Sequence, residues 1–136
     1  KIKEKIESGM PVFGICAGLI LLSKNAKDRV IGKTDQPLLD LLDVHVERNS
    51  FGRQKESFEA EIGLPDIGIT DFNGVFIRAP SISDVGNNVE ILSKYNEKII
   101  AVKHGNIIGT SFHPELTVDS SIHKYFVNLI KQSKLN

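Results

Sequence analysis

The stretch PVFGICAGLILLSK, residues 11 to 24, contains the only cysteine of this 136-residue chain. An apolar run from residue 11 to residue 15 predicts a short buried strand, and the residues after Cys16, AGLILLSKN, predict a helix whose apolar side faces a sheet. Gly14 and Gly18 flank the cysteine in the pattern G-x-nucleophile-x-G, in which glycines relieve crowding at a sharp turn. The stretch therefore predicts an α/β fold with Cys16 at a turn between strand and helix.

Two interpretations of Cys16 follow from this position. Free cysteine is among the residue types most often buried as a small hydrophobe, so an inert core thiol is one interpretation. The other rests on the following helix, whose first amides would point at the sulfur and favour the thiolate through their partial positive charge. Because a thiolate attacks carbonyl carbon, this second interpretation makes Cys16 a nucleophile.

The composition indicates a single domain that spans residues 1 to 136. Hydrophobic residues make up 40% of the chain and charged residues 25%, which suits a globular protein with a sizeable core. Seventeen Lys and Arg balance seventeen Asp and Glu, and no basic run carries interleaved aromatics, so we expect no nucleic acid and no membrane among its partners. A single cysteine suits a reducing compartment, and no apolar stretch reaches the roughly 18 residues that span a bilayer, so we expect a cytoplasmic protein.

The N-terminal half predicts a helix followed by alternating strands. Residues 1 to 8 have the apolar spacing of a helix, which Gly9 would end. Residues 25 to 42 contain proline, glycine and several charges, which favours a surface connection. The segments 43–48 and 56–62 both alternate in polarity, and the residues NSFGRQ between them predict a turn, so we expect a hairpin-like pair.

The C-terminal half predicts strands followed by a helix. Strands are expected at residues 74–80, 89–93, 98–105 and 106–112. The turn pair Gly105-Asn106 would join the last two, and Asp119 or Ser120 would cap the final helix. Helices on both sides of several strands predict an α/β fold with a three-layer open sheet and an antiparallel portion.

A nucleophilic thiol needs a base, and the base needs an orienting partner. His113 lies just past an apolar strand in SFHPEL, with Glu115 two residues on. Pro114 favours an extended His113, and residues two apart on an extended segment face the same side. Because sites in open α/β sheets lie at the carboxyl ends of strands, these features predict a Cys16–His113–Glu115 triad for acyl transfer through a thioester. The alternative interpretation of SFHPEL is an ordinary turn at the end of a strand that carries a charged pair.

We interpret three further histidines as ordinary strand or surface residues: His45, His104 and His123.

The motifs GICAGL and SFHPEL together resemble those of the triad-type glutamine amidotransferases. The segments VERNSFGRQKESFEAEI and GVFIRAP are similar to those of one group among them, the glutaminase subunits of pyridoxal 5'-phosphate synthase. The motif HPELT and the helix that contains HKYF fit the same group. The resemblance implies a flavodoxin-like, class I glutamine amidotransferase fold.

The resemblance also implies an activity and a set of site residues. Glutamine would be hydrolysed to glutamate and ammonia, and the ammonia would pass to a (β/α)8 synthase subunit that makes pyridoxal 5'-phosphate (vitamin B6). Cys16 would be the nucleophile, His113 the general base and acid, and Glu115 the residue that orients the histidine. Glutamine would be contacted by Arg48, Ile77 and Arg78. Neither a metal nor an organic cofactor is implied for this half-reaction, and no Cys/His cluster has the spacing of a zinc site.

One departure from the resemblance concerns the start of the chain. Relatives begin with a strand and a helix and then carry a Gly-Gly-Glu-Ser stretch that supplies an oxyanion amide, and no such stretch is present in this sequence. We therefore expect an N-terminally truncated chain, in which loss of one oxyanion donor would reduce the rate roughly 100- to 1,000-fold. Two other functions stay open: a different Cys-His-Glu hydrolase, such as a γ-glutamyl hydrolase or a cysteine peptidase, and a non-catalytic domain that binds a synthase.

Overall fold

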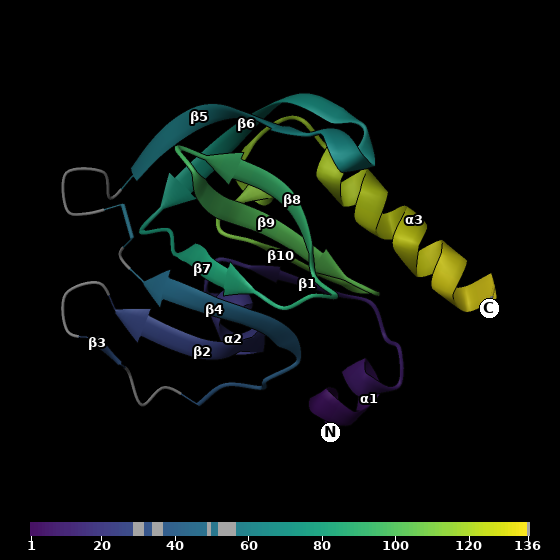
Figure 1. Cartoon of the computed structure of the whole chain (residues 1–136). Helices are drawn as coiled ribbons and strands as arrows, with labels where there is room; N and C mark the ends of the chain where they lie inside the picture. Colours follow the sequence, from purple (N-terminus) through teal and green to yellow (C-terminus); the bar gives the residue numbers. More distant parts are fainter. Residues whose placement is uncertain (29–31, 34–36, 49, 52–56, 136) are drawn as a thin grey trace.

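The computed structural model describes residues 1–28, 32–33, 37–48, 50–51 and 57–135. Its N-terminal part contains helix α1 (Ile2–Glu7), strand β1 (Val12–Ile15) and helix α2 (Ala17–Leu22), as predicted from the apolar spacing (Figure 1). Gly9 follows α1 with φ of 109°, a conformation that few other residues adopt. The glycine therefore ends α1 and turns the chain toward β1.

The main sheet is mixed and curled (Figure 1). Its strand order in the described residues is β1-β10-β9-β7-β4-β2-β3, with β8 paired to β9. β1 is parallel to β10 and β2 is parallel to β4, while the other pairs are antiparallel. The strands not yet bounded are β2 (Ser23–Asp28), β3 (Gly32–Lys33), β4 (Leu42–Arg48), β7 (Ser81–Val85), β8 (Glu90–Tyr95), β9 (Lys98–His104) and β10 (Ile107–Thr110).

The predicted hairpin between residues 43–48 and 56–62 is wrong. β4 pairs with β2 and β7 in the main sheet, whereas β5 (Ser57–Leu64) pairs with β6 (Ile69–Ile77) in a separate two-stranded ribbon. A short 3-10 turn (Pro65–Ile67) joins β5 to β6 and ends at Gly68, where φ is 77°. Alternation showed that both segments are strands, but it carries no information about which strand is the partner. Most of the predicted NSFGRQ turn lies outside the described residues.

Three further expectations also need correction. The helix after Cys16 ends at Leu22, and Ser23–Asp28 form a strand where the end of this helix and the start of a surface connection were expected. This strand, SKNAKD, is polar and lacks the β-branched and aromatic residues that signal a strand. β6 begins earlier than predicted, at Ile69, and β7 was not predicted. The hairpin of β9 and β10 was predicted correctly, since Ile107 pairs with His104 across the Gly105-Asn106 turn.

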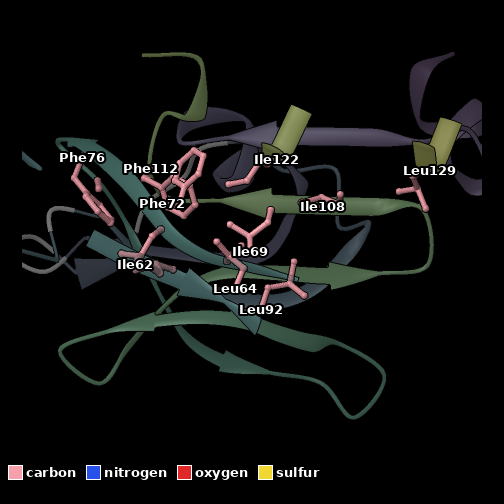
Figure 2. Close-up of a cluster of buried hydrophobic side chains, with 13 residues drawn as sticks. Ile62, Leu64, Ile69, Phe72, Phe76, Leu92, Ile108, Phe112, Ile122 and Leu129 are labelled. Atoms are coloured by element: carbon pink, nitrogen blue, oxygen red, sulfur yellow. The ribbon is translucent and has the colours of Figure 1, made fainter. Parts of the chain in front are cut away.

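The core has two parts, one on each face of the sheet. On one face, the β5–β6 ribbon and helix α3 (Ser121–Leu135) cover the sheet through the cluster that Figure 2 shows. On the other face, α1 and α2 pack against the sheet through Ile6, Leu19 and Leu22. The fold is therefore mixed α/β, as predicted. The predicted C-terminal helix is present, and the Asp119 carboxylate accepts a hydrogen bond from its first amide, that of Ser121, at 2.8 Å.

Candidate active site

Cys16 occupies the sharp turn between β1 and α2. Its φ and ψ are 54° and −101°, which places a non-glycine residue in a sparsely populated region of backbone conformation. Its N–H donates to the carbonyl of Thr110 at 2.8 Å, next to the pairing of Ile15 with Thr110. The turn predicted at Cys16 is therefore present, and its start is anchored on β10.

The two glycines around this turn have different roles. A Cβ on Gly14 would lie 2.5 Å from Cδ1 of Leu22 and 2.9 Å from the backbone of Gly18. A Cβ on Gly18 would meet nothing within 4 Å. Gly14 therefore allows α2 to pack closely on β1, whereas Gly18 is not needed for space.

Gly14→Ala should destabilise the fold by about 1–3 kcal/mol, because the added methyl group would push α2 away from β1. Gly18→Ala is the matched control, since it adds the same methyl group to open space inside a helix. It should be neutral or stabilising by up to about 1 kcal/mol. Urea denaturation of both variants measures the difference, and equal stabilities would contradict this account of Gly14.

His113 and Glu115 form a hydrogen-bonded pair. The Nδ1 atom of His113 lies 2.7 Å from Oε2 of Glu115. His113 is extended, with φ of −105° and ψ of 90°, and its backbone N–H donates to the carbonyl of Val75 in β6 at 2.7 Å. When Nδ1–H donates to the carboxylate, the lone pair of a neutral imidazole is on Nε2, so Nε2 is free to accept a proton. The contact of His113 with Glu115 is present, but it does not arise from an extended segment as predicted, because Pro114–Leu116 form a short 3-10 helix that begins after the extended His113.

Three segments converge at the thiol. β1 and β10 are parallel neighbours, so Cys16 and the segment with His113 both follow the carboxyl ends of their strands. The charge of Glu115 acts on the thiol of Cys16 and raises its pKa. The third segment is the end of β6, where the carbonyl of Ile77 lies 3.8 Å from Sγ of Cys16. The structure thus brings Cys16, Ile77 and the His113–Glu115 pair to one end of the sheet.

The surroundings of the Cys16 thiol raise its pKa. Burial is the largest effect on this pKa and raises it, the amide of Ala17 lowers it, and the negative charge of Glu115 raises it further. The net result is a pKa above the ordinary value of 9.0. The amide acts in the direction that the sequence predicts, but α2 has only six residues and burial outweighs it. A base is therefore needed to remove the proton, which is the role predicted for His113.

The predicted substrate-binding residues lie at the same end of the sheet. Ile77 ends β6 with 38% of its surface exposed, and Arg78 follows it, exposed and with φ of 46°. Arg48 is the last residue of β4. Continuing the strand registers places Arg48 level with Ile15, four strands along the curled sheet (Figure 1). Ile77 and Arg78 are thus near the thiol, whereas Arg48 lies farther along the same edge.

Sequence reasoning missed the backbone groups that build this site. The carbonyls of Thr110 and Val75 fix Cys16 and His113, and neither is marked by its residue type. These two carbonyl groups could be located only once the neighbouring strands were known. The pairing of Val12 with Ile107 and of Ile15 with Thr110 was predictable only once β1 and β10 were known to be neighbours.

A separate cavity lies at the other end of β1 and β10. It has a volume of about 460 Å³ and is lined by parts of α1, by Asp40 and Leu41, and by the β9–β10 turn. His104 is part of this lining, and its Nδ1 atom is 2.9 Å from the carbonyl of Asn88. Because Cys16 and His113 do not line it, this cavity is not part of the candidate active site.

The structure offers no group of three or more His, Cys, Asp or Glu side chains placed to hold a metal ion, as far as its described residues go. In the same residues, no helix is both long enough and apolar enough to cross a membrane.

Comparisons with known proteins identify the family of this chain. A model of the SNO glutamine amidotransferase family matches residues 1–132. A protein of Nitrosopumilus maritimus named pyridoxal 5'-phosphate synthase subunit PdxT is 66% identical over 133 residues, which are 98% of this chain and 65% of that protein. Proteins of the same name from Geobacillus thermodenitrificans and Saccharolobus islandicus are 52% and 47% identical, with 65% and 66% of their lengths covered. The chain thus spans about two thirds of the length of these relatives.

Comparison with solved structures also points to the glutamine amidotransferases. A crystal structure of a glutamine amidotransferase matches with a TM-score of 0.85 and 41% identity, over 96% of this chain and 66% of the other. A glutamine amidotransferase from Thermotoga maritima matches with a TM-score of 0.56 at 13% identity, which supports the fold alone. The resemblance found in GICAGL and SFHPEL is therefore confirmed at the level of the family.

Proposed function

The chain belongs to the SNO glutamine amidotransferase family, and on this premise we propose that it hydrolyses glutamine and delivers the ammonia to a pyridoxal 5'-phosphate synthase subunit. The observation that carries the proposal is the hydrogen bond of 2.7 Å between His113 and Glu115, in the segment that follows β10, the parallel neighbour of β1. The name shared by the relatives supports the pathway. The partner would be the (β/α)8 subunit that the resemblance implies.

The first half of the reaction would form a thioester. Nε2 of His113 takes the proton from the Cys16 thiol, and Sγ attacks the carboxamide carbon of glutamine. The carbon–nitrogen bond breaks, and the proton on His113 passes to the leaving ammonia. Glu115 holds the imidazole in the required tautomer and stabilises its protonated form. Because burial raises the pKa of the thiol, less of it ionises by itself and more of the reaction depends on this proton transfer.

The second half would release glutamate. Water loses a proton to His113 and attacks the thioester carbon, and the carbon–sulfur bond breaks. His113 then returns the proton to Sγ, which restores the thiol. One water is consumed for each glutamine, and the products are glutamate and ammonia.

Substrate binding is assigned to Arg48, Ile77 and Arg78. A guanidinium holds a carboxylate through two parallel hydrogen bonds, which suits the arginines to the α-carboxylate of glutamine. The carbonyl of Ile77 accepts from the thiol at 3.8 Å, so it offers an acceptor beside the reacting carbon. We assign residues 1–136 to one glutamine amidotransferase domain of the flavodoxin-like, three-layer class, and we place the reaction in the cytoplasm, because a free thiol persists in a reducing compartment.

Glutamate release from glutamine tests this proposal, with and without a pyridoxal 5'-phosphate synthase subunit. We expect release to rise about tenfold or more with the subunit, the ratio expected if about a tenth of the free chain is competent. Equal activity in both cases would contradict the dependence on the partner. Cleavage of γ-glutamyl peptides with inert glutamine would indicate a γ-glutamyl hydrolase. Tight binding of the subunit without any glutamate release would indicate a non-catalytic binding domain.

A further inference from the structure

Lys98, the first residue of β9, contacts a pair of buried serines. Its Nζ atom lies 2.9 Å from Oγ of Ser50, and Oγ of Ser50 is hydrogen-bonded to Oγ of Ser81. Both serines are 3% exposed. An ammonium group only donates, so Ser50 accepts from Lys98, and either hydroxyl can donate in the bond between Ser50 and Ser81. Lys98, Ser50 and Ser81 therefore form one hydrogen-bonded chain that ends at two buried serines.

These serines connect the two segments that carry the assigned substrate-binding residues. Ser50 lies two residues after Arg48, at the end of β4. Ser81 begins β7, three residues after Arg78. The neighbouring strand residues, Glu47 and Ser81, are partners in the register of β4 and β7. The hydroxyl pair therefore extends the contact between these segments beyond the last strand pairing.

Lys98 makes a second contact with the same region. Its Nζ atom lies 5.6 Å from the ring centroid of Phe51, within the range of a cation–π interaction. The ring of Phe51 packs against Phe76, at 5.8 Å between centroids, and Phe76 precedes Ile77. Lys98 is thus linked to the end of β6 through aromatic rings and to the start of β7 through the serines.

The contacts of the Lys98 ammonium group are with a hydroxyl and a ring. Within the part of the chain that the structure describes, no Asp or Glu lies within ion-pair distance of this group. The half-buried Lys98 contacts Ser50 through a hydrogen bond and Phe51 through a cation–π interaction.

We propose that Lys98 is a positioning residue for glutamine binding, which holds the end of β4 against residues 77–81. The proposal rests on the proposed function, since it takes Arg48, Ile77 and Arg78 as the groups that bind glutamine. Binding groups that come from the ends of two strands, β4 and β6, need a fixed separation, and a shift of about 1 Å lowers activity strongly. Lys98 fixes this separation through the two contacts described above.

Lys98→Met tests the proposal, because it removes the charge and the donors and keeps an unbranched side chain. With the full-length protein and the synthase subunit, we expect KM for glutamine to rise about tenfold and kcat to change less than about twofold. Lys98→Arg keeps the charge, the donors and the ring contact, so KM should return to within about threefold of the original value. Lys103→Met is the matched control on the same strand, since Lys103 lies over the ring of Tyr125 at 5.8 Å, away from Ser50. Its KM should not change.

Hydrogen exchange gives a readout that needs no glutamine turnover. In Lys98→Met, the backbone amides of Ser50 and Ser81 should exchange about tenfold faster than in the original chain, and in Lys103→Met they should not. An unchanged KM, or a fall in kcat alone, would overturn the proposal. If the original protein releases no glutamate, the proposed function fails. The exchange rates of the Ser50 and Ser81 amides then test the role of Lys98 without any measurement of activity. Faster exchange in Lys98→Met supports the positioning role, and unchanged exchange overturns it.

Discussion

Cys16→Ala should abolish glutamate release from glutamine, with a fall in rate of at least about 10⁴-fold, because removal of a nucleophile leaves only the catalysis that binding supplies. Glutamate is measured with the synthase subunit present, under conditions in which the original chain turns over. The substitution keeps Cβ, so alanine meets the same backbone constraint at φ of 54° as cysteine does. The fold and the contact with the subunit should therefore persist.

The control for this variant is binding of the synthase subunit. If Cys16→Ala binds the subunit normally and releases no glutamate, the loss is chemical. A variant that retains more than about a tenth of the original rate would remove Cys16 from the mechanism and leave the inert-thiol interpretation. A variant that neither binds nor turns over would point to a structural effect of the turn, and Cys16→Ser would then separate the two effects, since serine is close to cysteine in size.

The parts of the site that the sequence predicted depend on residues close together in the chain. Cys16 between Gly14 and Gly18 is a signal of a few residues, and so is His113 with Glu115 two positions on. Pro114 restricts the backbone locally, and the predicted contact of the two side chains is found at 2.7 Å. The hairpin of β9 and β10 has the same local character, since its turn pair joins strands that are neighbours in the chain.

The parts that the sequence could not predict depend on residues far apart in the chain. β4 and β5 both alternate, and only packing decides that β4 pairs with β7 while β5 pairs with β6. The polar strand Ser23–Asp28 lies beside β4, and its residue types do not favour a strand. The pKa of the Cys16 thiol is a tertiary property too, because burial and the charge of Glu115 both come from the folded chain.

Features predicted from local sequence and features that depend on distant residues both act on the Cys16 thiol. The sequence predicts a nucleophile, a base and an orienting group, and the structure places the carbonyl of Ile77, from a third segment, 3.8 Å from Sγ. Burial raises the pKa of the thiol more than the amide of Ala17 lowers it, so the proposed reaction depends more on His113 than on the helix. The negative charge of Glu115 has two opposed effects: it opposes the thiolate directly and it supports the imidazolium that forms when the thiol loses its proton.

Glu115→Gln separates these two effects. With glutamine as substrate, kcat should fall by about 10³- to 10⁴-fold, because an amide can donate to Nδ1 and then holds the imidazole in the wrong tautomer. Alkylation of Cys16 by iodoacetamide should change in the other direction. The charge of Glu115 raises the pKa of the thiol, so its removal lowers that pKa and increases the thiolate fraction at a fixed pH below it. The variant should therefore be alkylated faster than the original chain at about pH 8.

Asp119→Asn is the matched control for Glu115→Gln, since it is also an acid-to-amide change and lies four residues along the chain. Asparagine can keep the hydrogen bond that Asp119 accepts from the amide of Ser121, and Asp119 is not among the groups that shift the pKa of Cys16. Both its kcat and its alkylation rate should match those of the original chain. A Glu115→Gln variant that loses kcat but is alkylated no faster would show that the charge of Glu115 does not reach the thiol. A variant that keeps its kcat would exclude Glu115 as the residue that orients His113.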